Sequence, residues 1–441
     1  MIAIRLSTDR KQALLRLTDM TSTTHSEKLT HYPAFLCFWL ARLFNSFSFN
    51  ILSVAVGWQI YDITGSAFHL GLIGLIQFIP ALVFALPAGH VADQYHRRKV
   101  MIFCICFEWL GLLSLSALSF SGQITQGWIL LLIGLIGLFR TFESPASQSI
   151  VPALVPERIL PRALAVNAAG GEAASIIGPA LGGFLYLLGV SYVYAIAAGL
   201  TLIALLLVTQ VKYVYQQPPR MPMNMKNLFS GVRFIRGHSI ILGVLSLDLF
   251  AVLLGGATAL MPIFAKDILH TGPWGLGLLQ SAPGVGALLM SLVLARFTIE
   301  RNVGMVMFSS VAAFGVATII FGLSTSLLLS LSALFVLGAV DMVSMVIRGT
   351  LVQLETPDEM RGRVNSVYSI FVNTSNQLGE FESGMMAAAF GAVGATLIGG
   401  IGTLAVVGLW MFWFPDIRQR QRLVEQSKAH DSDTESVVHA Q

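Results

Sequence analysis

Apolar stretches of about 20 residues follow one another along almost the whole chain, separated by short polar loops. A helix rises 1.5 Å per residue, so about 20 residues cross the ~30 Å hydrocarbon core of a bilayer. Lipid offers no hydrogen-bond partners, and one apolar segment satisfies its own backbone only as a helix. Charged residues make up 11% of the chain, against about 25% in soluble domains. We therefore predict an all-α membrane protein with twelve transmembrane helices, at residues 34–61, 68–92, 99–120, 127–151, 163–188, 191–211, 239–265, 273–296, 303–323, 327–354, 363–389 and 394–414.

Positive charge is distributed unevenly between the two sides that these spans define. Of the 27 lysine and arginine residues, 23 lie in segments on the side of the amino terminus, three lie within spans, and Lys266 lies in a loop on the other side. Basic residues resist translocation, so the asymmetry predicts that both tails are cytoplasmic. Because the bases are spread over many short loops, the net charge of +4 does not indicate a nucleic-acid partner.

The chain divides into two similar halves. Pro156–Arg162 resembles Pro357–Arg363, 201 positions later, and Gln77 in the second span corresponds to Gln280 in the eighth. This common order predicts two six-span halves related by duplication, an arrangement typical of secondary transporters. The predicted segments are a tail (1–32), a first six-helix half (33–211), a central loop (212–238), a second six-helix half (239–415) and a tail (416–441), with translation starting at either Met1 or Met20.

The loop between the second and third spans carries an acid and several bases. Gly89, Asp93, Arg97 and Arg98 follow the pattern Gly-x-x-x-Asp plus a basic cluster. This pattern between two spans resembles the signature loop of the major facilitator superfamily, although the family usually has glycine where this chain has His96. The resemblance covers about residues 34–415. It implies the major facilitator fold and a gating latch at Asp93, with the two arginines as candidate partners; the alternative is a positive anchor at a helix end.

A second motif lies in the fifth span, at Gly178-Pro179-Ala-Leu-Gly182-Gly183. Proline removes a backbone donor, and glycines let helices approach closely and bend. The run resembles the motif that marks antiporters within the superfamily, which are exporters. The alternative is an ordinary packing kink.

Ionisable residues inside spans cost a few kcal/mol each on insertion scales, so each one is a functional candidate. Each such residue has two possible roles: it forms a structural ion pair, or it takes a direct part in transport. Arg140 and Glu143 are three positions apart and therefore share a helix face. The full set is Arg42, Glu108, Arg140, Glu143, Glu172, Asp248, Asp341, Arg348, Glu380 and Glu382.

Roles in proton or charge coupling follow from position and from the resemblance. Arg42 and Asp248 occupy equivalent places in the two halves, and superfamily geometry brings their spans together, which predicts a cross-half pair. Glu172 lies in mid-span as a candidate proton carrier. Asp341 and Arg348 resemble the enterobactin-exporter-like branch of the superfamily, in which Arg348 is either structural or coupled to transport.

The predicted function is secondary transport. Neither a phosphate-binding loop nor a cysteine–histidine metal spacing occurs, so no cofactor, metal or enzymatic activity is expected. The resemblance implies a monomer in the bacterial inner membrane that exports a small organic molecule, either a siderophore-like metabolite or amphipathic drugs, by alternating access and proton antiport. The alternatives are a lysophospholipid flippase, an importer of the same fold, or a non-transporting scaffold or sensor.

Overall fold

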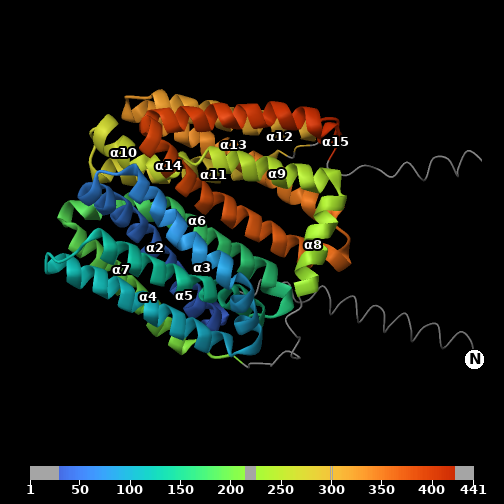
Figure 1. Ribbon diagram of the computed structural model, residues 1–441. Helices are drawn as coiled ribbons and strands as arrows, with labels where there is room; N and C mark the ends of the chain where they lie inside the picture. Colours follow the sequence, from blue (N-terminus) through green and yellow to red (C-terminus); the bar gives the residue numbers. More distant parts are fainter. Residues whose placement is uncertain (1–28, 214–224, 298, 300, 423–441) are drawn as a thin grey trace, which may run out of the picture.

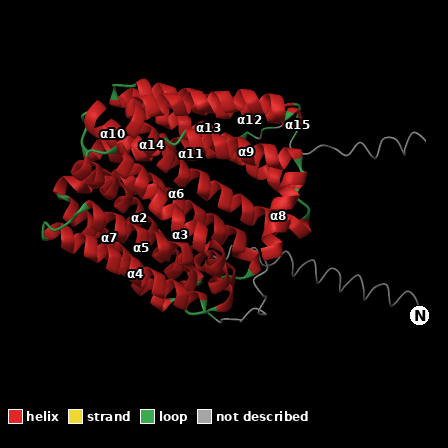
Figure 2. Ribbon diagram, in the orientation of Figure 1, coloured by secondary structure: helices red, strands yellow, loops and turns green. Residues whose placement is uncertain are grey.

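The computed structural model describes residues 29–213, 225–297, 299 and 301–422 (Figure 1). Most of the predicted N-terminal tail, with Met20, and part of the central loop and of the C-terminal tail lie outside these residues. The described part is almost entirely helical, and it contains no strand (Figure 2). The predicted fold class is therefore confirmed.

The first half contains six long helices, each close to a predicted span. They begin and end where turn-forming or charged residues interrupt the apolar runs; for example, Gly65, with φ +58°, terminates α2 in the left-handed conformation that glycine adopts without strain. The helices are α2 (Pro33–Thr64), α3 (Ala67–Gln94), α4 (Arg97–Phe120), α5 (Gln126–Ile150), α6 (Leu160–Leu185) and α7 (Val190–Gln210).

The second half repeats this layout after the short helix α8 (Met225–Gly237), which lies within the predicted central loop. Gly231 of α8 lies against the backbone of Arg363, so the helix packs on the second half. The remaining helices are α9 (Ser239–Leu254), α10 (Met261–Ile263), α11 (Pro273–Arg296), α12 (Val303–Leu323), α13 (Leu327–Glu355), α14 (Asp358–Trp413) and α15 (Pro415–Arg418).

Eleven helical segments of the described chain are long and apolar enough to cross a membrane. One of them, α14, contains two spans, which gives the predicted total of twelve. Its 56 residues would measure about 84 Å as one straight helix, nearly three times the thickness of the hydrocarbon core. Gly391, with φ +75°, interrupts it with a non-helical backbone conformation. Two successive spans are therefore joined at Gly391, as the predicted break between residues 389 and 394 requires.

The seventh span is broken rather than continuous. After α9 ends at Leu254, a 3-10 turn (Ala257–Leu260), α10 and a π-helical turn (Phe264–Ile268) continue it. A Cβ on Gly256 would lie 2.8 Å from the carbonyl oxygen of Gly379, so this backbone packs directly against α14, and Pro262 has no amide hydrogen to donate. Such irregular segments occur at membrane depth only where protein or a cavity surrounds them, and the cavity described below meets this condition.

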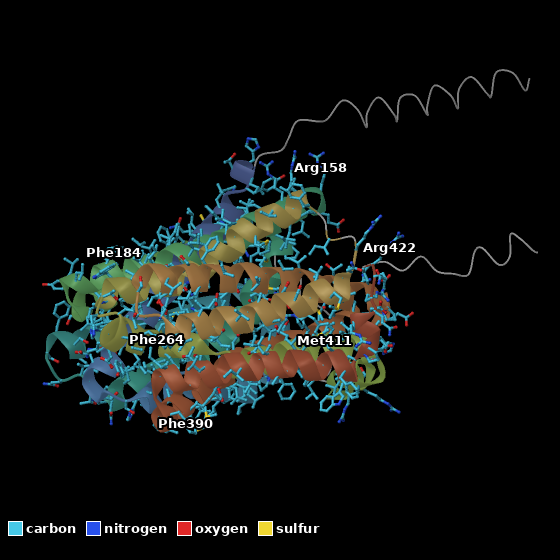
Figure 3. All side chains as sticks on the ribbon, turned by 90° about the horizontal axis from the view of Figure 1, so that it is seen from above. Arg158, Phe184, Phe264, Phe390, Met411 and Arg422 are labelled. Atoms are coloured by element: carbon cyan, nitrogen blue, oxygen red, sulfur yellow. The ribbon has the colours of Figure 1, made fainter. Side chains whose placement is uncertain are left out.

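The two halves lie side by side, with residues from blue to green in one and from yellow to red in the other (Figure 1). We call the end near α8 and α15 the α8 end, and the opposite end the α10 end. Arg158 and Arg422 lie at the α8 end, whereas Phe184, Phe264 and Phe390 lie toward the α10 end (Figure 3). Large apolar side chains cover the outer surface, which suits contact with lipid rather than water.

Candidate functional site

Glycines bring the two halves into contact at the α10 end. In the crossing of α3 with α14, a Cβ on Gly71 would lie 2.9 Å from the Cα of Gly384. In the crossing of α6 with α11, a Cβ on Gly183 would lie 2.5 Å from the carbonyl oxygen of Pro273 and 3.0 Å from the Cα of Gly277. Side chains larger than hydrogen do not fit at these positions, so the closure of this end depends on glycine.

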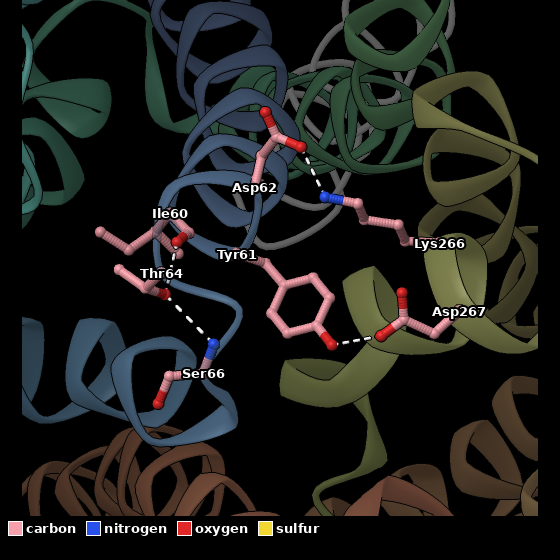
Figure 4. A network of polar contacts seen from close by, with 7 residues as sticks. All are labelled: Ile60, Tyr61, Asp62, Thr64, Ser66, Lys266 and Asp267. Carbon is pink, nitrogen blue, oxygen red and sulfur yellow. Dashed lines mark hydrogen bonds and ion pairs between the residues drawn. The ribbon is translucent and has the colours of Figure 1, made fainter.

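Polar contacts reinforce the same closure (Figure 4). Lys266 Nζ pairs with Asp62 Oδ1 at 2.5 Å, and the Tyr61 hydroxyl donates a hydrogen bond to Asp267. Both contacts join the end of α2 to the π-helical turn of the other half. Lys266, the base that the charge count placed alone on this side of the membrane, therefore belongs to a contact between the halves.

We expect the Asp62–Lys266 pair to make a small contribution, because its side chains are 56% and 34% exposed. Exposed ion pairs are typically worth about 0–1 kcal/mol. Asp62→Asn should therefore change the ratio of conformers by less than about fivefold, measured from spin-label distances across the α10 end. A much larger change would show that the pair, and not the glycine packing, holds this end closed.

A cavity lies between the halves, next to the closed end. One region of about 400 Å³ is lined by both halves and by the broken seventh span, including Thr258 and Pro262. Its amide and carboxyl side chains come from four helices: Asn50, Gln77, Gln280, Gln377 and Glu380. Gln77 and Gln280, which the repeat pairs, thus face one space. Glu380 lines the cavity and Glu382 does not, as their two-residue spacing predicts.

A second region of about 760 Å³ adjoins the first through the shared residues Phe49, Gln77 and Gln377. Its lining extends along α3 to Gly89 and along α5 to Gln148, which lie near the α8 ends of those helices. The cavity therefore reaches from mid-membrane toward the α8 end. Arg42, Arg140 and Glu143, all predicted from the sequence, line this region.

The antiporter-like motif joins three helices. Cβ atoms on Gly178 and Gly182 would lie 2.6 Å from Asn50 Cβ and 3.0 Å from the Ile51 carbonyl oxygen of α2. Gly183 contacts α11, and Pro179 lines the cavity. The motif therefore packs α6 closely between α2 and α11, and its role in antiport stays a prediction.

The signature loop makes contacts within the first half. Arg97 Nη1 donates to the Ser149 carbonyl at 2.5 Å, and Arg98 donates to the carbonyls of Val208, at 3.2 Å, and Thr209. Both arginines thus cap the ends of α5 and α7, where unpaired carbonyls accumulate. The side chain of Asp93 is outside the described part, so its latch stays a prediction.

The departure of the loop from the family pattern has little effect on its backbone. His96 has φ −62° and ψ 106°, a conformation open to any residue. A Cβ on Gly89 would meet nothing within 4 Å. Partial burial, with the charges of Lys99 and Arg98, lowers the pKa of His96, so this side chain adds no positive charge at neutral pH.

The first half contains a buried polar cluster. Arg42 Nη1 donates to Ser147 Oγ at 2.5 Å, and Asn45 Nδ2 donates to Glu108 Oε2 at 3.3 Å. The guanidinium of Arg140 lies 3.7 Å from the ring centroid of Phe49. Glu108 and Glu143 are 2% and 5% exposed, and Glu108 interacts electrostatically with Arg140 and Glu143. The cluster therefore contains two bases and two acids.

The second half contains a corresponding cluster. Arg348 pairs with Asp248, and its Nε donates to the Tyr368 hydroxyl at 3.1 Å. Asp248 also lines a small space of about 10 Å³ together with Asp341, Ser310 and Ser344. The two clusters are repeats: Ser147 and Arg348 are 201 positions apart, as are Arg140 and Asp341.

The predicted cross-half pair is not formed in this conformation. Arg42 bonds to Ser147 and Asp248 to Arg348, each within its own half. The physical reason is that each residue has a partner on a helix of its own half, on α5 for Arg42 and on α13 for Asp248, so neither side chain reaches across the cavity. Applying the 201-residue offset to Ser147 and Arg348 would have indicated these pairings, and the sequence interpretation missed Ser147 and Tyr368.

Glu172 does not join either cluster. Its side chain is exposed and contacts Ser175 of the same helix, with Ser175 Oγ 3.5 Å from Glu172 Oε2. It is absent from the residues that line the described cavity. Its assignment as a proton carrier therefore has no support from cavity geometry.

Comparisons with known proteins agree with this architecture. The enterobactin exporter EntS of Citrobacter koseri is 28% identical over 382 residues, covering 86% of this chain and 91% of the relative. That of Escherichia coli is 27% identical over 405 residues, covering 92% and 97%.

Solved transporters have the same fold. The nucleoside transporter NupG aligns with a TM-score of 0.65 at 16% identity, covering 88% of this chain and 99% of that structure. A D-xylose-proton symporter aligns with a TM-score of 0.67 at 13% identity, covering 88% of this chain and 99% of that structure. A bacterial homolog of the human lysosomal transporter Spinster, described as inward-facing and unoccupied, aligns with a TM-score of 0.67 at 15% identity, covering 89% of this chain and 97% of that structure.

The model of the family described as "Transmembrane secretion effector" matches residues 29–439, nearly the whole chain. Its relatives and structural neighbours are transporters and not enzymes. The chain therefore belongs to the transmembrane secretion effector family and is a multi-pass membrane transporter of the major facilitator type.

Proposed function

We propose that this protein exports a small organic molecule, a siderophore-like metabolite or an amphipathic drug, across the bacterial inner membrane in exchange for protons. The observation that carries the proposal is the cavity between the halves, sealed at the α10 end and extended toward the α8 end. Relatives named enterobactin exporters support a siderophore-like substrate. With both tails in the cytoplasm, the cavity of this conformer faces the side from which an exported molecule is loaded.

The transport cycle follows from the same contacts. Loading from the cytoplasm requires the α10 end to stay closed, which the glycine crossings and the Tyr61–Asp267 and Asp62–Lys266 contacts provide. Release outside requires these contacts to separate while the α8 end closes. The halves would then rock about the cavity, as in alternating access between paired repeats. Amide side chains from both halves would contact the substrate in either state, and we expect the chain to act as a monomer.

Transport into everted inner-membrane vesicles tests this function. Enterobactin and the fluorescent cation ethidium should each be offered to vesicles with an imposed proton gradient, acid inside. Accumulation of either compound above vesicles that lack the protein, abolished by an uncoupler, is the expected result. Asp416→Asn, a change at an exposed acid of α15, serves as a matched control and should transport normally.

A separate assay tests the alternative function, a lysophospholipid flippase, with a fluorescent lysophospholipid. Redistribution of this lipid between leaflets, without gradient-driven accumulation of enterobactin or ethidium, would contradict export. The folded state of the protein should be verified by gel filtration in each preparation.

A further inference from the structure

The second-half cluster carries an unbalanced charge. It contains the two acids Asp248 and Asp341 and the single base Arg348, whereas the first-half cluster contains two bases and two acids. Asp248 is 8% exposed and Arg348 is 4% exposed, so these two compensate each other. A second carboxylate at membrane depth has a high energetic cost unless a cation or a proton neutralises it. The surplus acid is Asp341.

The geometry places this surplus acid beside a space for one small molecule. Asp341, Ser344 and Arg348 follow one another at spacings of three and four on one face of α13. Asp341 and Ser344 line the space of about 10 Å³ with Asp248 and Ser310. That volume is about what one water molecule needs. The space can therefore hold one water molecule against the carboxylate of Asp341.

The neighbouring helices bring few competing charges. Among the described residues, α9 contributes Asp248, and α12 contributes the hydroxyl of Ser310 but no ionisable side chain. In α11 the ionisable residue is Arg296, at its α8 end. On α13 itself Glu355 is more distant and pairs with Arg420 at 2.7 Å.

From α14, Tyr368 bonds Arg348. Arg363 lies five residues earlier, is exposed and bonds Ser230 of α8, whereas Glu380 and Glu382 lie three turns or more further along that helix. Arg348 is therefore the base that responds most directly to the charge of Asp341.

Arg348 also connects the cluster to the transport cavity. It donates to Tyr368 of α14 at 3.1 Å, and the next residues, Ser369 and Ile370, line the larger cavity region. The same helix forms the crossing with α3 at the closed end, through Gly384. A change in the position of Arg348 therefore acts on a helix that both lines the cavity and closes the α10 end.

We propose that Asp341 carries the coupling proton and that the Arg348–Tyr368 contact transmits its charge state to α14. This inference rests on the proposed proton antiport. One proton from external water binds a carboxylate oxygen of Asp341 and leaves to cytoplasmic water in the conformer described here. While Asp341 is neutral, Arg348 stays with Asp248 and Tyr368, as observed. When Asp341 is ionised it competes for Arg348, weakens the contact with Tyr368 and favours opening at the α10 end.

Spin-label distances across the α8 end test the proposal. Labels at Glu157 and Glu359, exposed positions in the two halves, are introduced after Cys37, Cys104 and Cys106 are replaced by serine. From about pH 8 down to about pH 5, the population with the larger separation should grow, by up to about tenfold per pH unit, the limit for one linked proton. Asp341→Asn should keep the large separation at every pH.

Further variants separate a coupling role from a folding defect. Asp341→Glu should restore the pH response, and Tyr368→Phe should reduce it without removing the fold. Glu382→Gln, which changes an acid outside the cluster, is the matched control and should respond like the unmodified chain. A pH response of Asp341→Asn equal to that of the unmodified chain would overturn the proposal. A change in the spin-label distances of the unmodified chain when sodium replaces choline at constant pH would also overturn it.

Enterobactin distinguishes this inference from the function on which it rests. Distances that respond to enterobactin but not to pH would refute the role of Asp341 and leave export standing. Distances that respond to neither, in folded protein, would refute both the alternating-access function and the coupling site.

Discussion

Gly183→Leu is expected to open the α10 end, the largest conformational effect of any single change proposed here. A Cβ at this position would already lie 2.5 Å from the Pro273 carbonyl, and the obstructing atoms are backbone, which does not move aside as a side chain does. Overpacking of this kind costs about 1–3 kcal/mol or more. A cost of about 3 kcal/mol changes the ratio of closed to open conformers by about a hundredfold.

Spin labels at Gln123 and Thr325 would report this change, because both lie in exposed loops at the α10 end, one in each half. Their separation should increase in Gly183→Leu and also in Gly71→Leu, the corresponding contact on α3. Gly171→Leu is the matched control on the same helix, since a Cβ there meets nothing within 4 Å. Unchanged distances in the first two variants would show that the glycine crossings do not hold this end closed.

Arg348→Gln is expected to produce the largest loss of stability. It leaves the carboxylate of Asp248, which is 8% exposed, without its partner in a membrane span. Removing one member of a buried pair typically costs about 3–5 kcal/mol, because the remaining charge stays desolvated. The free energy of unfolding, measured by titrating SDS into mixed micelles, should fall by this amount.

A double variant tests whether the loss comes from the unpaired charge. Arg348→Gln with Asp248→Asn removes both charges and should recover a large part of the stability, so that the two single effects do not add. Arg301→Gln, at an exposed base between α11 and α12, should be neutral. Simple addition of the two single losses would contradict a direct pair between Asp248 and Arg348.

Several features of the fold were open to prediction because each depends on local composition. Apolar length determined the spans, and Gly391 lies in the short interval predicted between the last two. The break in the seventh span was not anticipated, because its residues are as apolar as those of a continuous helix. Its irregular backbone is stable only because the cavity and the surrounding helices supply the environment that lipid does not.

The residues of the candidate site likewise include some that the sequence predicted and some that it did not. The 201-residue repeat linked the two halves, and Gln77 and Gln280 indeed face one cavity. The partner of Asp248 was mistaken, because Arg42 and Arg348 are both plausible from spacing alone. The choice between them depends on which helix lies alongside α9 and on how far an arginine side chain reaches, and neither is encoded in spacing.

The sequence by itself determined that this chain spans a membrane as helices, in two related halves, because burial of about 20 apolar residues in lipid leaves no alternative backbone structure. It also marked the ionisable residues whose presence in lipid requires an explanation. The tertiary structure alone decided which charges meet, which end is closed, and that Asp341 is the acid left over when Asp248 pairs with Arg348 in the second-half cluster. These depend on packing between helices far apart in the sequence, where differences of a few ångströms determine whether two groups touch.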